Sequence, residues 1–277
     1  MDLIVNKSSK GRKNILISEN GKYYSYSEIT DSVDINRAIG ELHKRVPERM
    51  EEYSGDIIED IPVNPKKIFL PAINFRSHSE ENRTPSPKRP YFFTKFSNAV
   101  IGNNENIIKP GKVKYLDYEG EIAAIIGAKI KEASVENAIE SIFGFTVCND
   151  ISARDYQNDY QERLGKNWIL GKASDTFLPI GPRICMLEND IPDFQIKTYV
   201  NYEKRQDGYV HDMIFSFPEL IAEVSQFITL EPGDIITSGT PSGVAMGGSG
   251  RFLESGDTIT VGAEGIGNLT NKVVNAN

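Results

Sequence analysis

Residues 115–127 read YLDYEGEIAAIIG, and this stretch decides the fold that we predict for the chain. Its apolar residues indicate a β-strand, in which successive side chains point to opposite faces. Asp117, Glu119 and Glu121 therefore share one face, with neighbours about 6.5 Å apart. The next residues on that face are apolar, so the three acids stand at the edge of an apolar interior and need a counter-charge.

Three arrangements would relieve the repulsion between these carboxylates. The acidic face could be solvated, or basic side chains such as Lys112 and Lys114, which precede the strand, could neutralise it. A bridging cation is the third arrangement. The spacing alone leaves all three open.

A second acidic element follows at residues 142–161, IFGFTVCNDISARDYQNDYQ. It predicts an apolar strand and then a helix over 151–161, with Asp150 as the N-cap. Arg154 and Gln157 follow Asp150 at i+4 and i+7, which places all three on one helix face. The simplest reading is an Asp150–Arg154 ion pair. A third carboxylate would also complete a site for Mg²⁺, Mn²⁺ or Ca²⁺, because these ions prefer oxygen ligands.

Two later segments could bind an anion. Lys172 lies among apolar residues, where a lysine can pair with a carboxylate, although most lysines are solvated. The loop SGTPSG, residues 238–243, offers backbone N–H groups and hydroxyls, including that of Thr240. On this motif alone, an ordinary β-turn is the preferred interpretation.

The first sixty residues differ from the rest in their pattern. Two short β-like runs in 14–26 flank Asn20-Gly21, which predicts a hairpin. A helix is expected over 34–53, closed by Gly55, and a proline-containing connector over 60–69. We therefore expect a small N-terminal α/β domain at 1–64 and a larger domain at 65–277.

The larger part is mostly strand-like. Its candidate strands are 67–73, 91–96, 115–127, 142–148, 179–187, 195–202, 234–238 and 258–262. Besides 151–161, helices are expected at 134–141 and 216–228, and residues 78–90 are expected to form a mobile loop. This pattern predicts a β-rich α+β fold of mixed or barrel-like sheets with peripheral helices.

Composition excludes several classes of function. The net charge of −8 and the pI near 5.1 argue against nucleic acid or an anionic membrane as partner. No apolar run approaches about 20 residues, so no membrane span is expected. The N-terminus does not look like a signal peptide, and the two cysteines look like buried thiols. We expect a cytoplasmic protein.

Six segments, in order, make the chain from about Ile68 onward similar to the fumarylacetoacetate hydrolase family. They are LDYEGEIAAIIG, CNDISARDYQ, GKASDTFLPIGP, VNYEKRQDG, TLEPGDIITSGTPSGV and GIGNLTN. The resemblance implies rolled mixed β-sheets, a homodimer, and a divalent cation, commonly Mg²⁺, held by Glu119, Glu121 and Asp150. It implies 2-oxo acid substrates bound by Arg154, Gln157, Lys172 and Thr240. Asp117 matches no ligand position and is interpreted as a supporting residue.

The segment INFRSHSEEN, residues 73–82, resembles the family's lid motif. One helical turn would bring His78 and Glu81 together. The resemblance implies that His78 activates water and that Glu81 orients its imidazole. The alternative is a surface loop histidine. Two residues depart from the family pattern: Ile73, which precedes Asn74-Phe75, and Phe96. Both flank the lid, and this leaves substrate selection open.

The family resemblance predicts metal-dependent hydrolysis of a C–C bond in an acylpyruvate-like 2-oxo acid through a metal-bound enolate. In this prediction Lys172 is catalytic, because it holds the developing negative charge. The alternative is an isomerase or tautomerase of the 2-hydroxyhepta-2,4-diene-1,7-dioate type, or an oxaloacetate decarboxylase, with the same metal site. A sugar-acid dehydratase and a non-catalytic cation-binding module are further possibilities.

Overall fold

The structure is a computed structural model that describes residues 1–158 and 165–276. The N-terminal elements are β1 (Asp2–Lys7), β2 (Lys13–Glu19), β3 (Lys22–Ser25), α1 (Ile35–Lys44) and β4 (Glu51–Glu52). The elements that follow, up to the second acidic segment, are β5 (Ile68–Pro71), α2 (Arg76–Glu81), β6 (Phe92–Thr94), η1 (Ser97–Ala99), β7 (Val100–Ile101), β8 (Asn106–Lys109), β9 (Leu116–Asp117), β10 (Gly120–Ile126), α3 (Val135–Ala138), η2 (Ile139–Ser141), β11 (Ile142–Asn149) and β12 (Ser152–Ala153). The remaining elements are α4 (Arg154–Gln157), α5 (Trp168–Lys172), β13 (Leu178–Met186), β14 (Gln195–Val200), β15 (Glu203–Tyr209), η3 (Val210–Asp212), α6 (Phe217–Phe227), β16 (Ile235–Thr237), η4 (Ala245–Ser249), β17 (Thr258–Ala263) and β18 (Gly267–Asn275).

The main sheet runs in the order β4-β3-β2-β1-β13-β11-β10-β16-β5-β6, and β7 pairs with β13 outside this path. It is mixed, because β16–β5 and β13–β7 are parallel and the other pairs are antiparallel. Every residue of β10 and β11 is buried. Strands covered on both faces carry nearly continuous apolar runs, which explains the sequence of these two central strands.

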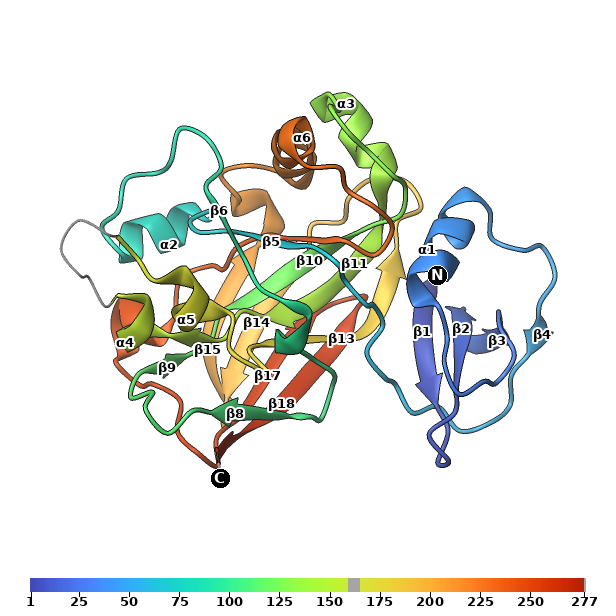
Figure 1. The fold of residues 1–277 in the computed structure, drawn as a ribbon, viewed down its shortest axis with the longest axis horizontal. Helices are drawn as coiled ribbons and strands as arrows, with labels where there is room; N and C mark the ends of the chain where they lie inside the picture. The colour runs from blue at the N-terminus through green and yellow to red at the C-terminus, as the bar shows by residue number, and fades with distance from the viewer. Residues whose placement is uncertain (159–164, 277) are drawn as a thin grey trace.

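A second sheet, β15-β14-β17-β18-β8, packs against the first. The packing is close at Gly120 in β10, where a Cβ atom would lie 2.1 Å from Thr198 Oγ1 of β14. A glycine is therefore needed between Glu119 and Glu121. Figure 1 shows β14, β17 and β18 as a group beside β10 and β11. The fold is the predicted β-rich one of mixed sheets, and the sheets stay open rather than closing into a barrel.

The N-terminal elements continue the main sheet, since β1 pairs antiparallel with β13. One core cluster joins side chains of both parts, such as Leu3 and Ile39 with Ile68 and Phe143. Figure 1 shows this unit in blue at one side of the molecule. The boundary at residue 64 falls between β4 and β5 in the connector, and the division into 1–64 and 65–277 stays a prediction.

Two of the helix predictions need correction. The helix expected over 34–53 ends at Lys44, because Arg45 is extended and Pro47 cannot continue a helix, and residues 51–52 form β4 instead. The helix expected over 151–161 begins only at Arg154, because residues 152–153 pair with β9 as β12. Its last predicted residues, 159–161, lie outside the described residues.

The other predicted elements are present. The hairpin turn has positive φ at Asn20 and Gly21, as an Asn-Gly turn requires. The helices at 134–141 and 216–228 form as α3 with η2, and as α6 with a capping box at Ser216. All eight candidate strands are found, although 115–127 is interrupted at residues 118–119. Four longer strands were not predicted: β1, β8, β15 and β18.

Candidate metal centre and its cavity

Three carboxylates meet where the central strands begin and end. Glu121 lies in β10, Glu119 just before it, and Asp150 just after β11. The antiparallel register pairs Gly120 with Asn149, and this pairing brings the two ends together. One oxygen of each acid lies within 4.8 Å of the others, and all three side chains are buried. We call these residues the acid triad.

Two buried cations partly neutralise the acid triad. Lys172 Nζ donates to Glu119 Oε2 at 2.6 Å and to Asp150 Oδ2 at 2.7 Å. Arg154 Nη2 donates to Glu119 Oε1 at 2.5 Å. Lys112 and Lys114 were one possible source of counter-charge, but the cations that contact the acid triad belong to later helices in the chain. Such partners are not recognisable from the sequence, because a β-core brings together segments that are far apart along the chain.

A third cation, Lys95, was not singled out from the sequence. It follows β6 and is fully buried, with Nζ 2.7 Å from Asp150 Oδ1. It also donates to the carbonyl oxygens of Ile151 and Phe177, at 2.9 and 2.7 Å. Burial lowers the pKa of Lys95 to about 8, although the charge of Asp150 opposes this shift. A lysine in a short apolar run was the only signal, and it is a weak one.

Glu121 differs from the other two acids because, among the described residues, it forms no ion pair with a lysine or arginine, and its Oε2 is buried with no hydrogen-bond partner. Burial, together with the charges of Asp150 and Glu119, raises its pKa well above the usual value. An unpaired buried carboxylate is costly, and a cation beside it would remove the cost. The oxygen-only ligand set fits Mg²⁺, Mn²⁺ or Ca²⁺. The acid triad could therefore bind a divalent metal ion.

The other two acids titrate differently. Burial alone would raise the pKa of Glu119, but Arg154 and Lys172 bring it well below the usual value. Burial raises the pKa of Asp150, and Lys172 and Lys95 offset this only in part. The charge at the acid triad is therefore uneven, and its least neutralised member is Glu121.

Arg154 is held by the acidic strand itself. Its Nε donates to Asp117 Oδ2 at 2.8 Å, and its Nη1 donates to Gln157 Oε1 at 2.9 Å. Asp117 also accepts from the backbone N–H groups of Tyr118, Ala245 and Met246. Asp117 thus supports Arg154 and is not part of the acid triad. Asp150 is not the cap of this helix, because three residues, including the two of β12, separate it from α4.

His78 and Glu81 lie together in α2, within the segment that was predicted to be a loop. His78 Nδ1 is 3.4 Å from Glu81 Oε2, and both side chains are largely buried. Glu81 Oε1 accepts from the Gly243 N–H at 2.9 Å, which ties α2 to the loop after β16. The Asn82 amide nitrogen is 3.0 Å from His78 Nε2.

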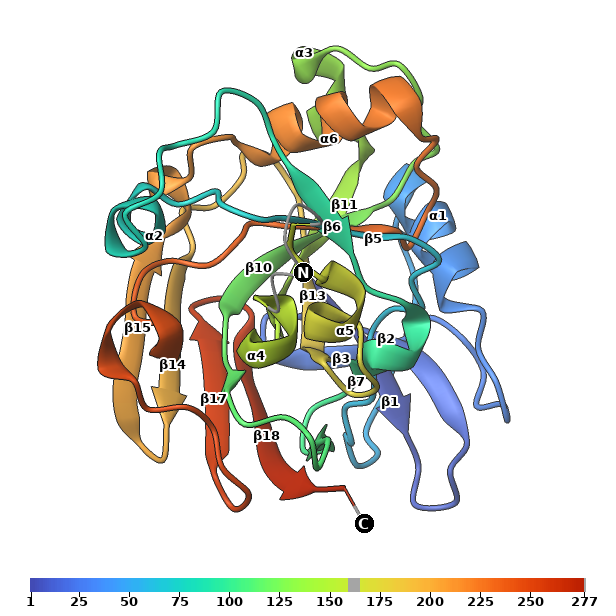
Figure 2. The same cartoon turned by 60° about the vertical axis from the view of Figure 1, so that its left-hand side comes forward.

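A cavity of about 320 Å³ adjoins the acid triad through Glu119, whereas Glu121, Asp150 and Glu81 are not in its lining. Figure 2 shows α4 and α5 close together in front of the central strands, with α2 to one side. The cavity is lined by Ala72, Ile73, His78, Asn82, Thr84, Phe93, Glu119, Arg154, Gln157, Asn158, Lys166, Trp168, Lys172 and Met246. Thr240 is not in this lining, and its hydroxyl donates to the Gly120 carbonyl at 2.9 Å and accepts from Gln206 at 2.7 Å.

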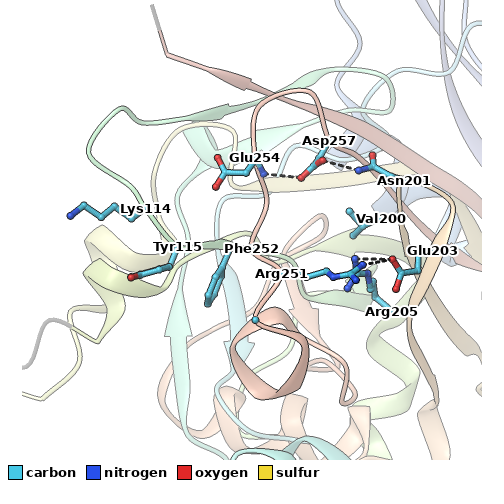
Figure 3. A pocket seen from close by; sticks show the side chains of 11 residues that line it. Lys114, Tyr115, Val200, Asn201, Glu203, Arg205, Arg251, Phe252, Glu254 and Asp257 are labelled. Carbon is cyan, nitrogen blue, oxygen red and sulfur yellow. Dashed lines mark hydrogen bonds and ion pairs between the residues drawn. The ribbon is translucent and has the colours of Figure 1, made fainter.

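A larger hollow, of about 460 Å³, lies between β14–β15 and the segment before β17 (Figure 3). Its acids already have partners. Glu203 accepts from Arg251 at 2.9 Å, and Asp257 accepts from Asn201 at 2.7 Å, as the dashed lines show. Size alone therefore does not mark the functional site, and the cavity beside the acid triad is the better candidate.

Comparison with known proteins agrees with this geometry. The family described as Fumarylacetoacetate (FAA) hydrolase C-terminal matches residues 67–274. The mitochondrial oxaloacetate tautomerase of Bos taurus is 40% identical over 213 residues, which cover 76% of this chain and 67% of that protein. Among the described residues, no helix is long and apolar enough to cross a bilayer.

Two solved structures are similar over their full or nearly full length. Fumarylacetoacetate hydrolase from Exiguobacterium antarcticum has a TM-score of 0.84 at 31% identity, and all of both chains is covered. The 2-hydroxyhepta-2,4-diene-1,7-dioate isomerase from Mycobacterium marinum has a TM-score of 0.77 at 28% identity, with 99% of this chain and 98% of that chain covered. The fold and the acid triad thus define a β-rich enzyme with a candidate divalent-cation site. This chain belongs to the fumarylacetoacetate hydrolase family of enzymes.

Proposed function

We propose that this enzyme interconverts the keto and enol forms of a small 2-oxo acid, as a tautomerase or isomerase assisted by a divalent cation. The observation that carries the proposal is the acid triad, in which Oε2 of Glu121 has no hydrogen-bond partner and Glu119 lines the same cavity as Lys172 and His78. Relatives named a tautomerase and an isomerase support this class of reaction. The cavity volume is at the lower end for ligand sites and favours a small substrate.

In this proposal Glu119, Glu121 and Asp150 hold Mg²⁺, and Mn²⁺ or Ca²⁺ would use the same oxygens. When bound, the cation supplies Lewis-acid polarisation of the substrate's 2-oxo carbonyl. Lys172 uses two of its three N–H bonds on Glu119 and Asp150, which leaves one for a substrate oxygen.

Arg154 and Gln157 line the cavity and are proposed to bind the substrate carboxylate. Thr240 is also proposed to bind the substrate. Its hydroxyl would first have to break its hydrogen bond with Gly120 or with Gln206, since it bonds both of them within the protein.

His78 is the proposed base. Glu81 faces Nδ1 and favours a proton on that nitrogen. Nε2 can then accept a proton. Asn82 is placed to donate a hydrogen bond to Nε2, and a bound substrate would replace this bond. Nε2 would take a proton from C3 of the substrate and release it to solvent, while the C2 oxygen would gain a proton from solvent. The reverse transfers restore the keto form, so the substrate's atoms are conserved.

A second candidate function is hydrolysis of the C–C bond of an acylpyruvate. The His78–Glu81 pair supports it equally, because a base held by an acid can activate water instead of removing a C3 proton. Decarboxylation of oxaloacetate is a third outcome at the same site. The relatives named a tautomerase and an isomerase favour isomerisation, whereas the one named a hydrolase favours hydrolysis.

Proton NMR in D₂O tests the proposal, because enolisation exchanges the C3 hydrogens of any 2-oxo acid. We expect Mg²⁺-dependent exchange with oxaloacetate that EDTA abolishes. His78→Gln should slow the exchange by about 10²–10⁴-fold while the binding of oxalate, measured by calorimetry, stays within a few-fold. Wild-type rates in this variant would remove His78 as the base. With an acylpyruvate as substrate, pyruvate and the carboxylic acid of the acyl group as products would instead establish hydrolysis.

We also propose that the enzyme acts as a cytoplasmic homodimer, as the family resemblance implies. Both cysteines are unpaired, which suits a reducing compartment. Light scattering would give about twice the 30.9 kDa mass of one chain for a dimer, and the single-chain mass would contradict this proposal.

A further inference from the structure

A second ammonium group, that of Lys166, lines the cavity at an exposed position beside α5. Its Nζ lies 5.2 Å from the centre of the Trp168 ring. Within residues 1–158 and 165–276, Lys166 forms no ion pair, and the attraction of Glu119 for its charge acts only from a distance. Its contact with the protein is therefore aromatic, a cation–π contact rather than an ionic one.

The same aromatic residues connect Lys166 with Lys172. Trp168 stacks on Phe93, with ring centres 4.8 Å apart and planes 8° from parallel. Lys172 Nζ lies 4.9 Å from the centre of the Phe93 ring. The cavity therefore has an ammonium group at the acid triad, an apolar stacked pair, and another ammonium group at the exposed rim.

The charges of the two lysines are balanced differently. Glu119 is the one acid in the cavity lining among the described residues, and it already accepts from Lys172 and Arg154. Although the side chain of Lys166 is exposed, partial desolvation at the cavity lowers its pKa, and the positive charges of Arg154 and Lys172 lower it further. An anion at the rim would relieve this repulsion, and Lys166 is the group placed to receive it.

We propose that Lys166 is a specificity-determining residue that pairs with a second, distal carboxylate of the substrate. The substrate would then be a 2-oxo dicarboxylate, with its 2-oxo end at Lys172 and the acid triad. Its methylene carbon would lie against Trp168 and Phe93. This inference rests on the proposed function and narrows its substrate class from 2-oxo acids to 2-oxo dicarboxylates.

A matched pair of substrates isolates the distal carboxylate. Oxaloacetate and 2-oxobutanoate share the 2-oxo acid end, and only the first has a distal carboxylate. The rate of C3 exchange in D₂O gives kcat/KM for both. The preference for the dicarboxylate is kcat/KM for oxaloacetate divided by kcat/KM for 2-oxobutanoate. We expect this ratio to fall roughly tenfold in Lys166→Gln, because a charge-assisted contact is lost. The loss should appear mainly in KM.

Two further variants separate recognition from a general effect of charge. Lys166→Arg should keep most of the preference, because a cation remains. Lys129→Gln removes another exposed lysine, which lies outside the cavity lining, and should keep the wild-type ratio. An unchanged ratio in Lys166→Gln, or the same fall in Lys129→Gln, would overturn the proposal.

A binding measurement keeps this inference separate from the proposed function. Calorimetry with succinate and butanoate in the presence of Mg²⁺ compares a dicarboxylate with a monocarboxylate and needs no turnover. A preference for succinate that Lys166→Gln abolishes would support the role of Lys166, whether or not the 2-oxo acids react. A failure of both 2-oxo acids to react would refute the proposed function alone. Equal affinity of the wild type for both ligands would refute the dicarboxylate inference.

Discussion

Replacing Glu121 with glutamine should make the metal-free protein more stable and the metal-loaded protein less stable than the wild type. Glu121 is buried, its Oε2 has no hydrogen-bond partner, and Glu119 and Asp150 repel its charge. Glutamine has nearly the same shape and carries no charge. Without metal it therefore removes a repulsion, and with metal it removes a ligand.

The size of the first effect follows from the burial of Glu121. We expect the free energy of unfolding of the metal-free variant to be about 1–3 kcal/mol higher near neutral pH, the range for a desolvated polar group without a partner. The pKa of Glu121 is raised in the folded protein, so folding favours its protonated form. The penalty in the wild type is therefore absent below the unfolded pKa of about 4.3 and grows as the pH rises above it.

Metal should reverse the order of the two proteins. A ligand at about 1,000 times its dissociation constant stabilises a folded protein by about 4.1 kcal/mol, which exceeds the expected advantage of the metal-free variant. The wild type should gain this amount with Mg²⁺, and Glu121→Gln should gain little, because an amide is a poor substitute for a carboxylate ligand. For a domain of this size, each kcal/mol corresponds to a melting-temperature shift of about 2–4 °C.

Urea unfolding measures both effects, in EDTA and in Mg²⁺ and at several pH values. Glu264→Gln is the matched control, because Glu264 is exposed and far from the acid triad in sequence, and it should leave both curves unchanged. A metal-free Glu121→Gln protein that is less stable than the wild type would show that Glu121 is satisfied without metal. Equal stabilisation of both proteins by Mg²⁺ would show that Glu121 is not a ligand.

Two other predictions test neighbouring parts of the molecule. Lys95→Met leaves Asp150 without one of its buried cations and should lower the free energy of unfolding by about 3–5 kcal/mol, measured in urea with EDTA; a change below about 1 kcal/mol would contradict it. Tyr26 has its pKa raised to about 12 by burial and by its bond to Glu41. Its contribution to stability is therefore present below pH of about 10 and lost as the pH rises toward about 12. Tyr26→Phe should reduce the loss of stability in that range, and identical pH profiles would contradict this.

Local pattern was enough to predict much of the fold. The buried strands β10 and β11, the Asn20-Gly21 hairpin and the capped helix α6 each follow from periodicity or turn chemistry within a few residues. The strands that were missed include β15, EKRQDGY, whose polar residues give no apolar alternation. Such a strand forms because its neighbour β14 is already in place, and this is tertiary information.

The acid triad was only partly predictable. Alternation indicated that Asp117, Glu119 and Glu121 share a face. The family resemblance named Glu119, Glu121 and Asp150 as the ligands. The helix face invoked for Asp150 is wrong, because the pairing of β12 with β9 delays the helix until Arg154. What joins Asp150 to Glu121 is the antiparallel register of β10 with β11.

The sequence by itself determined the family, the central strands and the identity of the acids, because these depend on the order of residues within short segments. Only the tertiary structure decided how the charges are balanced. Lys95, Arg154 and Lys172 come from three separate segments, and each reaches the acid triad through the packing of sheets and helices. The unpaired oxygen of Glu121 is likewise invisible in YLDYEGEIAAIIG, because whether a buried carboxylate has a partner depends on every segment that surrounds it.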